Sequence, residues 1–465
     1  MSVPSGYVAG PLLENFYVHT WTNIKYAGDS SLFVIIVGHC IPTQGNQTEK
    51  PVADLLAALR QGESYFLYSL GFYTGRHAII FGSVGDVRVV NDATAMRTVF
   101  YAAEGGIIAS HALLVERALG GRPAINQVPF QYGFPGNRTP YERTKVLTAN
   151  TYYWLTANVV RRFWPFVQLE PYGVDAAAAE TLQRSAFALR YISSNQPVRL
   201  TLTAGLDSRA ILAIALHAGI EFQTYTYGDN TLTDIDRAVA TELAEKFSLR
   251  HDVINQRFED PALEKRLREV NYMDHHMPWV GSLMDYYPSP ESVAVLGNSL
   301  EIGRSNTLSA RRYRNLVPNS AESMANLHYR RVGVGKREAI KAFGHERYME
   351  ISRQAFQAFI YETSFDLVTT SMNPFDLFYW EHRMSAWQSL AMNERDFYGH
   401  SFVPFNSRSI FETMLGVSEK ERYADATVYR MIEMVDPELL DLPINPKQWP
   451  QIDAPARAES VVGYA

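Results

Sequence analysis

The segment from residue 174 to residue 247 alternates helix-like and strand-like patterns, and this alternation most constrains the fold. A long helical pattern, VDAAAAETLQRSAFALRYI, comes first, and the apolar and β-branched run VRLTLT follows it. A second helix, the strand FQTYTYG and the helix DIDRAVATELAEKF complete the series. Helices that alternate with buried strands predict a parallel α/β sheet. Beyond about residue 310 the chain is mainly helical in pattern.

The first 120 residues have a different pattern, dominated by short strands. Apolar or alternating runs such as SLFVIIVG, GRHAIIFGS and DVRVVND are separated by Gly, Asp and Asn turns. One helix, VADLLAALRQG, lies among them and ends at a glycine. Residues 121 to 172 are rich in Pro, Gly, Asn and Tyr, which indicates a connecting region with a hairpin. We therefore predict two domains, 1–172 on stacked antiparallel sheets and 173–465 on the parallel sheet.

Composition and charge exclude several classes of protein. Hydrophobic residues make up 46% of the 465 residues, enough for a real core, and the net charge of −6 provides no basic surface for nucleic acid. The single cysteine, Cys40, excludes an internal disulfide framework and a cysteine-rich zinc site. The first residues lack the pattern of a signal peptide, and the apolar stretch 32–41 is too short to span a bilayer. These features predict a cytoplasmic protein that binds neither nucleic acid nor a membrane.

The turn after the strand VRLTLT carries the residue types of an anion-binding loop. Ala204 and Gly205 are small enough for the backbone to approach a ligand closely, and the helix that follows directs free N–H groups at it. Thr203 and Ser208 add hydroxyl groups. Because Asp207 would repel a bare phosphate, an anion site here requires a divalent cation between the two. In the alternative interpretation Asp207 and Ser208 only cap the helix, and this turn alone does not decide between the two.

Three segments in this part of the chain resemble the asparagine synthetase family. Thr203-Ala204-Gly205-Leu206-Asp207-Ser208, here called the first loop, resembles the pyrophosphate loop of N-type ATP pyrophosphatases, written Ser-Gly-Gly-x-Asp-Ser. The strand that ends at Tyr227 and Gly228 resembles the second strand of that family, and acidic residues and a histidine follow it at similar spacing: Asp234, Asp236 and His251. The second loop resembles the family's Gly-Glu-Gly-Ala-Asp-Glu segment and comprises Gly297, Asn298, Ser299, Leu300 and Glu301.

The front part of the chain resembles the class II glutamine amidotransferase domains. The matched positions are Gly75, Arg76, Asp92, Arg97, Tyr101 and Ser110. With VPFNSRSIFETML near the C-terminus, the resemblance covers most of residues 60 to 450. The glutaminase reaction of that family uses an N-terminal cysteine, whereas this chain has Ser2. We therefore expect that the front domain has lost ammonia production, with a nucleophilic Ser2 as the alternative.

Two further positions depart from the family pattern. Asn298 stands where the family has Glu or, in related β-lactam synthetases, Tyr, and an amide cannot accept a proton at neutral pH. Ala426 stands where the family has a lysine that stabilises developing negative charge. Lys420 and Lys447 lie nearby in the sequence, and which residue supplies that charge is left open.

The resemblance implies both a fold and a site. The fold is α/β, with an Ntn-type antiparallel β-sandwich with flanking helices in front and an adenine nucleotide α-hydrolase-like parallel-sheet domain with a helical C-terminal part behind. ATP and Mg²⁺ are the implied cofactors, with Mg²⁺ held by Asp207 and Glu301. The implied catalytic residues are Asp207, Ser208, Glu301 and Asn298. The implied nucleotide contacts are Thr203, Ala204, Gly205, Leu206, Asp207, Ser208, Tyr227, Gly228 and Gly297.

The implied activity is ATP-dependent amide-bond formation. A substrate carboxylate is adenylated with release of pyrophosphate, and an amine that this chain does not derive from glutamine then attacks. The alternatives are a diverged, non-catalytic nucleotide-binding scaffold and, further, glutamine-dependent asparagine synthesis that uses Ser2. The expected partner is a small molecule or peptide with a carboxylate and an amine, and a homodimer is left open.

Overall fold

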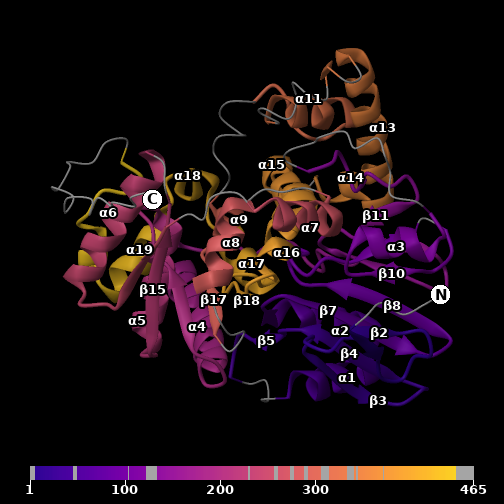
Figure 1. Cartoon of the computed structure of the whole chain (residues 1–465), viewed down its shortest axis with the longest axis horizontal. Helices are drawn as coiled ribbons and strands as arrows, with labels where there is room; N and C mark the ends of the chain where they lie inside the picture. Colours follow the sequence, from indigo (N-terminus) through magenta and orange to yellow (C-terminus); the bar gives the residue numbers. More distant parts are fainter. Residues whose placement is uncertain are drawn as a thin grey trace, which may run out of the picture.

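Two sheets organise the chain, an antiparallel sheet in its first part and a parallel sheet in its second part (Figure 1). This mixed α/β architecture confirms the coarse prediction from the sequence. The computed structural model describes the following residues: 6–45, 50–102, 104–121, 133–228, 231–255, 260–272, 277–286, 292–304, 314–331, 340–341, 344–369 and 371–446.

The antiparallel sheet has six strands in the order β13-β12-β8-β7-β4-β3. Its strands are β3 Ile24–Gly28, β4 Phe33–Gly38, β7 His77–Ser83, β8 Asp86–Asn91, β12 Thr151–Trp154 and β13 Val159–Arg162. Both faces are apolar, because Val34 and Ile36 join one core cluster whereas Phe33 and Ile35 join another. Successive side chains on a strand point to opposite faces, so the unbroken apolar run of β4 serves two buried faces.

Helices cover one face of this sheet, and Leu12, Phe16, Tyr101 and Ile108 pack in the apolar cluster on the other face. The covering helices are α1 Pro51–Gln61 and α2 Glu63–Ser69, followed by the 3-10 turn η1 Leu70–Phe72. In the small sheets, β1 Tyr7–Ala9 pairs with β2 Tyr17–His19, and β5 Ile41–Pro42 pairs with β6 Tyr73–Thr74. A further small sheet pairs β9 Phe100–Ala102 with β10 Ile108–Ala109 and β11 Thr144–Val146. Helix α3 Ala112–Ala118 packs beside this sheet. The predicted connecting region therefore supplies a hairpin, β12–β13, that extends the large sheet through β8.

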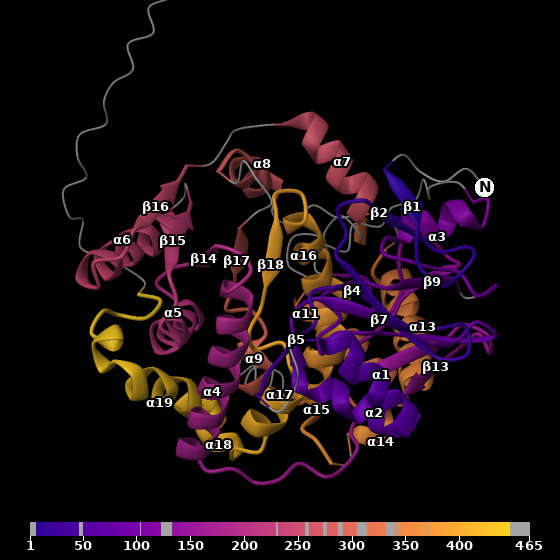
Figure 2. The same cartoon turned by 90° about the horizontal axis from the view of Figure 1, so that it is seen from below.

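The parallel sheet has five strands in the order β16-β15-β14-β17-β18, and every pair is parallel (Figure 2). The strands are β14 Val198–Thr201, β15 Phe222–Tyr227, β16 His251–Ile254, β17 Val293–Val295 and β18 His400–Phe402. The strand β18 lies in the part predicted to be mainly helical. Its three residues are too few to show a periodicity, and its parallel pairing with β17 defines it.

Helices cover both faces of the parallel sheet, as a doubly wound sheet requires. On one face lie α4 Val174–Ser193, α5 Leu206–Ala218, α6 Thr231–Lys246, α17 Arg408–Leu415 and α19 Ala426–Val435. On the other face lie α7 Pro261–Asn271, α8 Met277–Tyr286 and, near them, α16 Ser389–Arg395. The predicted helices at residues 174–192 and 234–247 are confirmed as α4 and α6.

The remaining helices follow β17 in the chain, and most of them belong to the core cluster of the antiparallel sheet. They are α9 Leu300–Gly303, α11 Ala321–Arg331, α13 His345–Thr363, α14 Phe365–Val368, α15 Pro374–Phe378, the π-helix η2 Tyr379–Gln388, α18 Glu419–Tyr423 and the 3-10 turn η3 Pro437–Leu440. One core cluster contains residues of β4 and β7 together with residues of α13 and η2. The predicted division at residues 172 and 173 stays a prediction. Within the described ranges, no helix combines the length and apolar composition needed to cross a bilayer.

A buried ion pair joins the sheet hairpin to the π-helix and gives a first testable expectation. Arg162 donates through Nη1 and Nη2 to the two carboxylate oxygens of Glu381, at 2.7 and 2.6 Å, and the Glu381 side chain has no exposed surface. Because Arg162→Met would leave Glu381 buried without this partner, we expect a loss of about 3–5 kcal/mol in the free energy of unfolding, measured by urea denaturation. The exposed pair Arg430–Asp175 provides the control, since Arg430→Met should change the free energy of unfolding far less than Arg162→Met. Equal losses for the two variants would contradict the expectation.

Candidate functional site

The two loops singled out in the sequence follow neighbouring strands of the parallel sheet. The first loop follows β14 and the second loop follows β17, and these strands pair with each other. From β14 the chain continues to β15 and β16 on one side, whereas β17 and β18 lie on the other (Figure 2). The strand order therefore reverses between β14 and β17, and in open α/β sheets ligands bind in the crevice outside the carboxyl ends of the strands at this point.

Internal hydrogen bonds shape the first loop. The hydroxyl of Ser208 donates toward the carbonyl of Gly205 at 3.0 Å and lies 3.0 Å from the hydroxyl of Thr203. The amide of Ala204 donates to Asp236 at 2.9 Å, which anchors the loop to α6. Helix α5 begins after Gly205, so Asp207 and Ser208 lie inside its first turn and neither stands at the N-cap position. The loop is therefore more than a capped helix start.

The second loop packs directly on the first. A Cβ on Gly297 would lie 2.7 Å from the carbonyl oxygen of Asp207, so only glycine permits this approach. Ser299 has a positive φ of 72° and is fully buried, and no described residue is a hydrogen-bond partner for its hydroxyl. Left-handed backbone at a non-glycine residue is costly and tends to occur at functional sites.

The contact at Gly297 gives a second expectation. In Gly297→Ala the new methyl group would overlap the backbone of Asp207 and push the two loops apart. We expect a loss of about 1–3 kcal/mol in the free energy of unfolding, comparable with overpacking of a core, and weaker nucleotide binding. Gly173→Ala is the control, because a Cβ there would meet no atom within 4 Å. Unchanged unfolding of Gly297→Ala would contradict the close approach.

Two carboxylates and an arginine meet where the loops touch. Arg304, just after α9, donates to Oδ1 of Asp207 and binds Asp425 through Nε at 2.8 Å and Nη2 at 3.0 Å. The side chains of Asp207, Arg304 and Asp425 keep 29%, 21% and 28% of their surface exposed, so a ligand can reach them. Burial outweighs the guanidinium of Arg304 and raises the pKa of Asp207. Burial and the charge of Asp207 raise the pKa of Glu301 to about 7.

The donor atoms at this point suit a magnesium ion. Oε2 of Glu301 is buried and has no hydrogen-bond partner among the described residues, which is unusual for a carboxylate oxygen. Mg²⁺ prefers oxygen ligands and is commonly held by one or two carboxylates together with phosphates of the substrate. No group of three or more His, Cys, Asp or Glu side chains placed for a metal lies within the described part of the chain. Asp207 and Glu301 therefore fit an ion that is shared with a phosphate, and not a closed protein site.

The other predicted residues lie around the loops at differing depths. Leu206 is fully buried in the core under α5, and Asn298 is half-buried in the turn before Ser299. Tyr227 ends β15, and its hydroxyl accepts from Nη2 of Arg395 at 3.4 Å. Gly228 follows it, and its carbonyl accepts from Arg237. The roles proposed for these residues stay predictions.

The basic residues near Ala426 are of interest because this chain lacks the lysine that the family has at that position. Ala426 begins α19, directly after Asp425, and Lys420 is exposed on α18. Lys447 and Ser2 lie outside the described residues. The sequence prediction did not include Arg304 and Asp425, although they lie close to Glu301 and Ala426 in the chain. An arginine three residues after Glu301 and an aspartate before Ala426 were the signals in the sequence.

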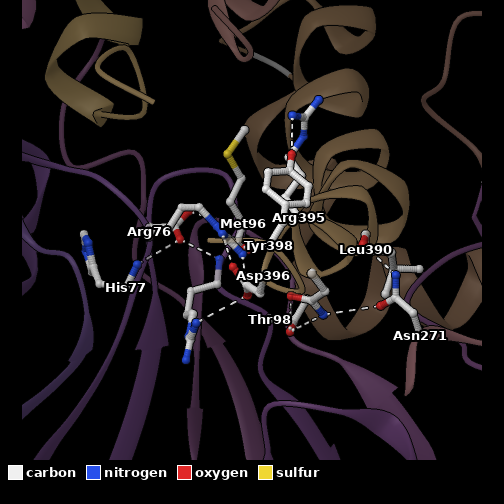
Figure 3. A network of polar contacts seen from close by, with 12 residues as sticks. Arg76, His77, Met96, Thr98, Asn271, Leu390, Arg395, Asp396 and Tyr398 are labelled. Carbon is white, nitrogen blue, oxygen red and sulfur yellow. Dashed lines mark hydrogen bonds and ion pairs between the residues drawn. The ribbon is translucent and has the colours of Figure 1, made fainter. Parts of the chain in front are cut away.

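The front residues matched to amidotransferases contact the second half of the chain. Arg76 donates to both carboxylate oxygens of Asp396, at 2.6 and 3.1 Å (Figure 3). Against the effect of burial, Arg76 and Arg97 hold the pKa of Asp396 below its ordinary value. The hydroxyl of Tyr101 donates to Glu362 at 3.2 Å. Cys40 lies between β4 and β5, where burial raises the pKa of its thiol, in agreement with a packing role.

Two hollows of moderate size lie away from the two loops. One, of about 380 Å³, lies between α3 and α7 and is lined by Arg117, Glu264 and Arg268 among others. The other, of about 160 Å³, lies beside Cys40 and the end of α4. Neither of these two hollows is lined by a residue of the first or second loop.

Comparisons with known proteins leave the family open. No protein-family model and no curated protein matches the chain. Among solved structures, the chain is similar to glutamine phosphoribosylpyrophosphate (PRPP) amidotransferase from B. subtilis, complexed with ADP and GMP. The TM-score is 0.20 and the identity 11%, over 63% of this chain and 60% of that chain. So remote a likeness carries no argument about function, and the chain spans less than two thirds of that protein.

Proposed function

We propose that this protein uses ATP and Mg²⁺ to activate a substrate carboxylate and to form an amide bond. The observation that carries the proposal is the packing of the second loop, which bears Glu301, against Asp207 of the first loop at the point where the strand order of the parallel sheet reverses. The resemblance of both loops to asparagine synthetase segments adds the reaction type. The amine acceptor is part of a small molecule or peptide.

The proposed steps assign a task to each part of the site. The first loop and the N-terminus of α5 bind the β- and γ-phosphates through backbone amides, and the hydroxyls of Thr203 and Ser208 hold the loop in shape. Asp207 and Glu301 would hold Mg²⁺, which would supply positive charge that offsets the phosphate oxygens. An oxygen of the substrate carboxylate attacks the α-phosphorus, and the bond to the β-phosphate breaks. The amine then attacks the acyl carbon, loses a proton, and AMP leaves.

Exchange of radiolabel between pyrophosphate and ATP tests this proposal. Adenylation is reversible, so label from pyrophosphate should enter ATP only when Mg²⁺ and a carboxylate substrate are both present. A panel of amino acids, peptides and other metabolites that carry a carboxylate and an amine supplies the candidates. Exchange with one of them, lost in Asp207→Asn, would support the enzyme. Mg²⁺–ATP binding without exchange or AMP formation on any panel member would favour the non-catalytic scaffold instead.

The glutamine-dependent alternative has its own test. Arg76, at a matched amidotransferase position, is already paired with Asp396 just after α16, which weighs against a role for its guanidinium in a glutaminase reaction. We expect the purified protein to release no ammonia from glutamine, with or without ATP. Ammonia release that disappears in Ser2→Ala would establish the alternative.

A further inference from the structure

The guanidinium of Arg304 is held at one end and faces the candidate site at the other. Asp425 accepts from Nε at 2.8 Å and from Nη2 at 3.0 Å, the two-point grip that fixes a guanidinium plane. The remaining terminal nitrogen, Nη1, points to Asp207. The grip therefore leaves one donor nitrogen directed at the carboxylate that is proposed to hold Mg²⁺.

The position of Asp425 at the start of α19 leaves its carboxylate available to bind Arg304. Asp425 has a positive φ of 55° and stands at the N-cap of α19, yet its side chain makes no capping bond. Aspartate is among the best N-cap residues, so a cap that is not made implies another use for the carboxylate. That use is the bond to Arg304. A non-glycine residue in left-handed backbone is retained here although it costs free energy.

The charges of the site indicate what Arg304 can do. Asp207 and Asp425 bond to the guanidinium of Arg304, and its positive charge lowers the pKa of both Asp207 and Glu301 against the effect of burial. Although burial alone would lower the pKa of Arg304, the bonds to Asp425 and the charge of Asp207 raise it, so the guanidinium stays charged. A polyphosphate that binds at the first loop brings oxygens that a guanidinium recognises well. Once Mg²⁺ binds Asp207, Nη1 loses its partner and is free to donate to such an oxygen.

We propose that Arg304 binds the β- or γ-phosphate of ATP at this site and that Asp425 positions it. The proposal rests on the proposed function. When Mg²⁺ and ATP bind, Nη1 leaves Asp207 for a phosphate oxygen, while Nε and Nη2 stay on Asp425. Because Asp425 directly precedes Ala426, Arg304 supplies a positive charge beside the start of α19, where the chain itself carries no lysine.

Calorimetric binding of three probes tests the proposal: ATP with Mg²⁺, inorganic pyrophosphate with Mg²⁺, and AMP. In Arg304→Gln we expect the Kd for the first two to rise about tenfold or more, because a charge-assisted hydrogen bond is lost, while AMP binding stays unchanged. Arg304→Lys should recover part of the affinity. Asp425→Asn should weaken the same two probes, and Asp425→Glu should recover part of that loss, which a merely structural role would not produce.

The control is Arg353→Gln. Arg353 also bridges two carboxylates, Glu322 and Glu350, at 2.8 Å each, but on α11 and α13 away from the loops. The Arg353→Gln substitution should leave the affinities for all three probes unchanged. Thermal unfolding identifies any variant that fails to fold, and Arg304→Lys keeps the test decisive if Arg304→Gln does not fold.

The outcomes separate the inference from the function on which it rests. If the wild-type protein binds neither Mg²⁺–ATP nor Mg²⁺–pyrophosphate, both fail. If wild type binds them and Arg304→Gln binds them equally well, the inference alone is overturned. Tighter binding by Arg304→Gln would also overturn it, because Arg304 would then compete with the ligand for Asp207. Equal weakening of AMP and pyrophosphate binding would contradict a contact with the β- or γ-phosphate.

Discussion

Asp207→Asn is expected to abolish Mg²⁺-dependent binding of ATP while leaving the parallel sheet folded. An amide lacks the charge that a Mg²⁺ ligand needs, and Asp207 lies where the two loops touch. Loss of an outer partner of a metal site can cost about 10–100-fold in affinity, so loss of a direct ligand should cost about 100-fold or more. Calorimetry with ATP, with and without Mg²⁺, measures this loss.

The matched control for Asp207→Asn is Asp175→Asn. Asp175 is an exposed aspartate on α4 whose carboxylate pairs with Arg430 at 2.6 Å. That variant should bind Mg²⁺–ATP like the wild type. If Asp207→Asn kept the full Mg²⁺ dependence of ATP binding, Asp207 would not be a ligand and the site would lie elsewhere.

Glu301→Gln should stabilise the metal-free protein at pH 8 but not at pH 5. The pKa of Glu301 is raised from its ordinary value to about 7 by burial and by the charge of Asp207. The folded protein therefore holds this proton more tightly than the unfolded chain does. The protonated Glu301 carboxyl therefore makes its full contribution to the free energy of unfolding below pH 4.5, and this contribution is lost as the pH rises through about 7.

The size of the effect follows from the same shift. Removal of the ionisable group should raise the free energy of unfolding by about 2 kcal/mol at pH 8, after allowance for solvent screening, and by little at pH 5. Urea denaturation in the presence of a chelator measures both values. In an Asp207→Asn background the stabilisation by Glu301→Gln at pH 8 should be smaller, because the charge of Asp207 no longer raises the pKa of Glu301. A gain that is the same at both pH values would contradict the account.

The same substitution should weaken Mg²⁺–ATP binding. Stability and binding would then change in opposite directions, as is common where a chain keeps a costly group for function. A surface carboxylate would not produce this combination. Glu438, an exposed acid of the turn η3, is a suitable comparison.

Much of the fold could be predicted because its signals are local. The alternation from residue 174 to residue 247 predicted α4, β14, α5, β15 and α6, since each element has its own periodicity and punctuation. The apolar runs of the first part predicted β4, β7 and β8 for the same reason. The strand β18 could not be found, because three residues become a strand only by pairing with β17.

The proximity of the two loops of the candidate site could be predicted from the sequence, whereas the ion pairs of its side chains could not. Asp207 and Glu301 belong to segments with recognisable patterns, and the order of the parallel strands brings those segments together. The ion pairs of Arg304 depend on contacts between α9 and the start of α19, which are about 120 positions apart in the chain. Likewise, no local pattern predicts that Arg76 meets Asp396. Long-range pairs of this kind follow from packing.

The most direct measurement of the central claim is a crystal structure with Mg²⁺ and a non-hydrolysable ATP analogue. We expect the triphosphate at the carboxyl ends of β14 and β17, with its phosphate oxygens bound to the amides of the first loop. Mg²⁺ should lie between these phosphate oxygens and the carboxylates of Asp207 and Glu301. A nucleotide bound elsewhere, in crystals that leave this edge of the sheet accessible, would contradict the account.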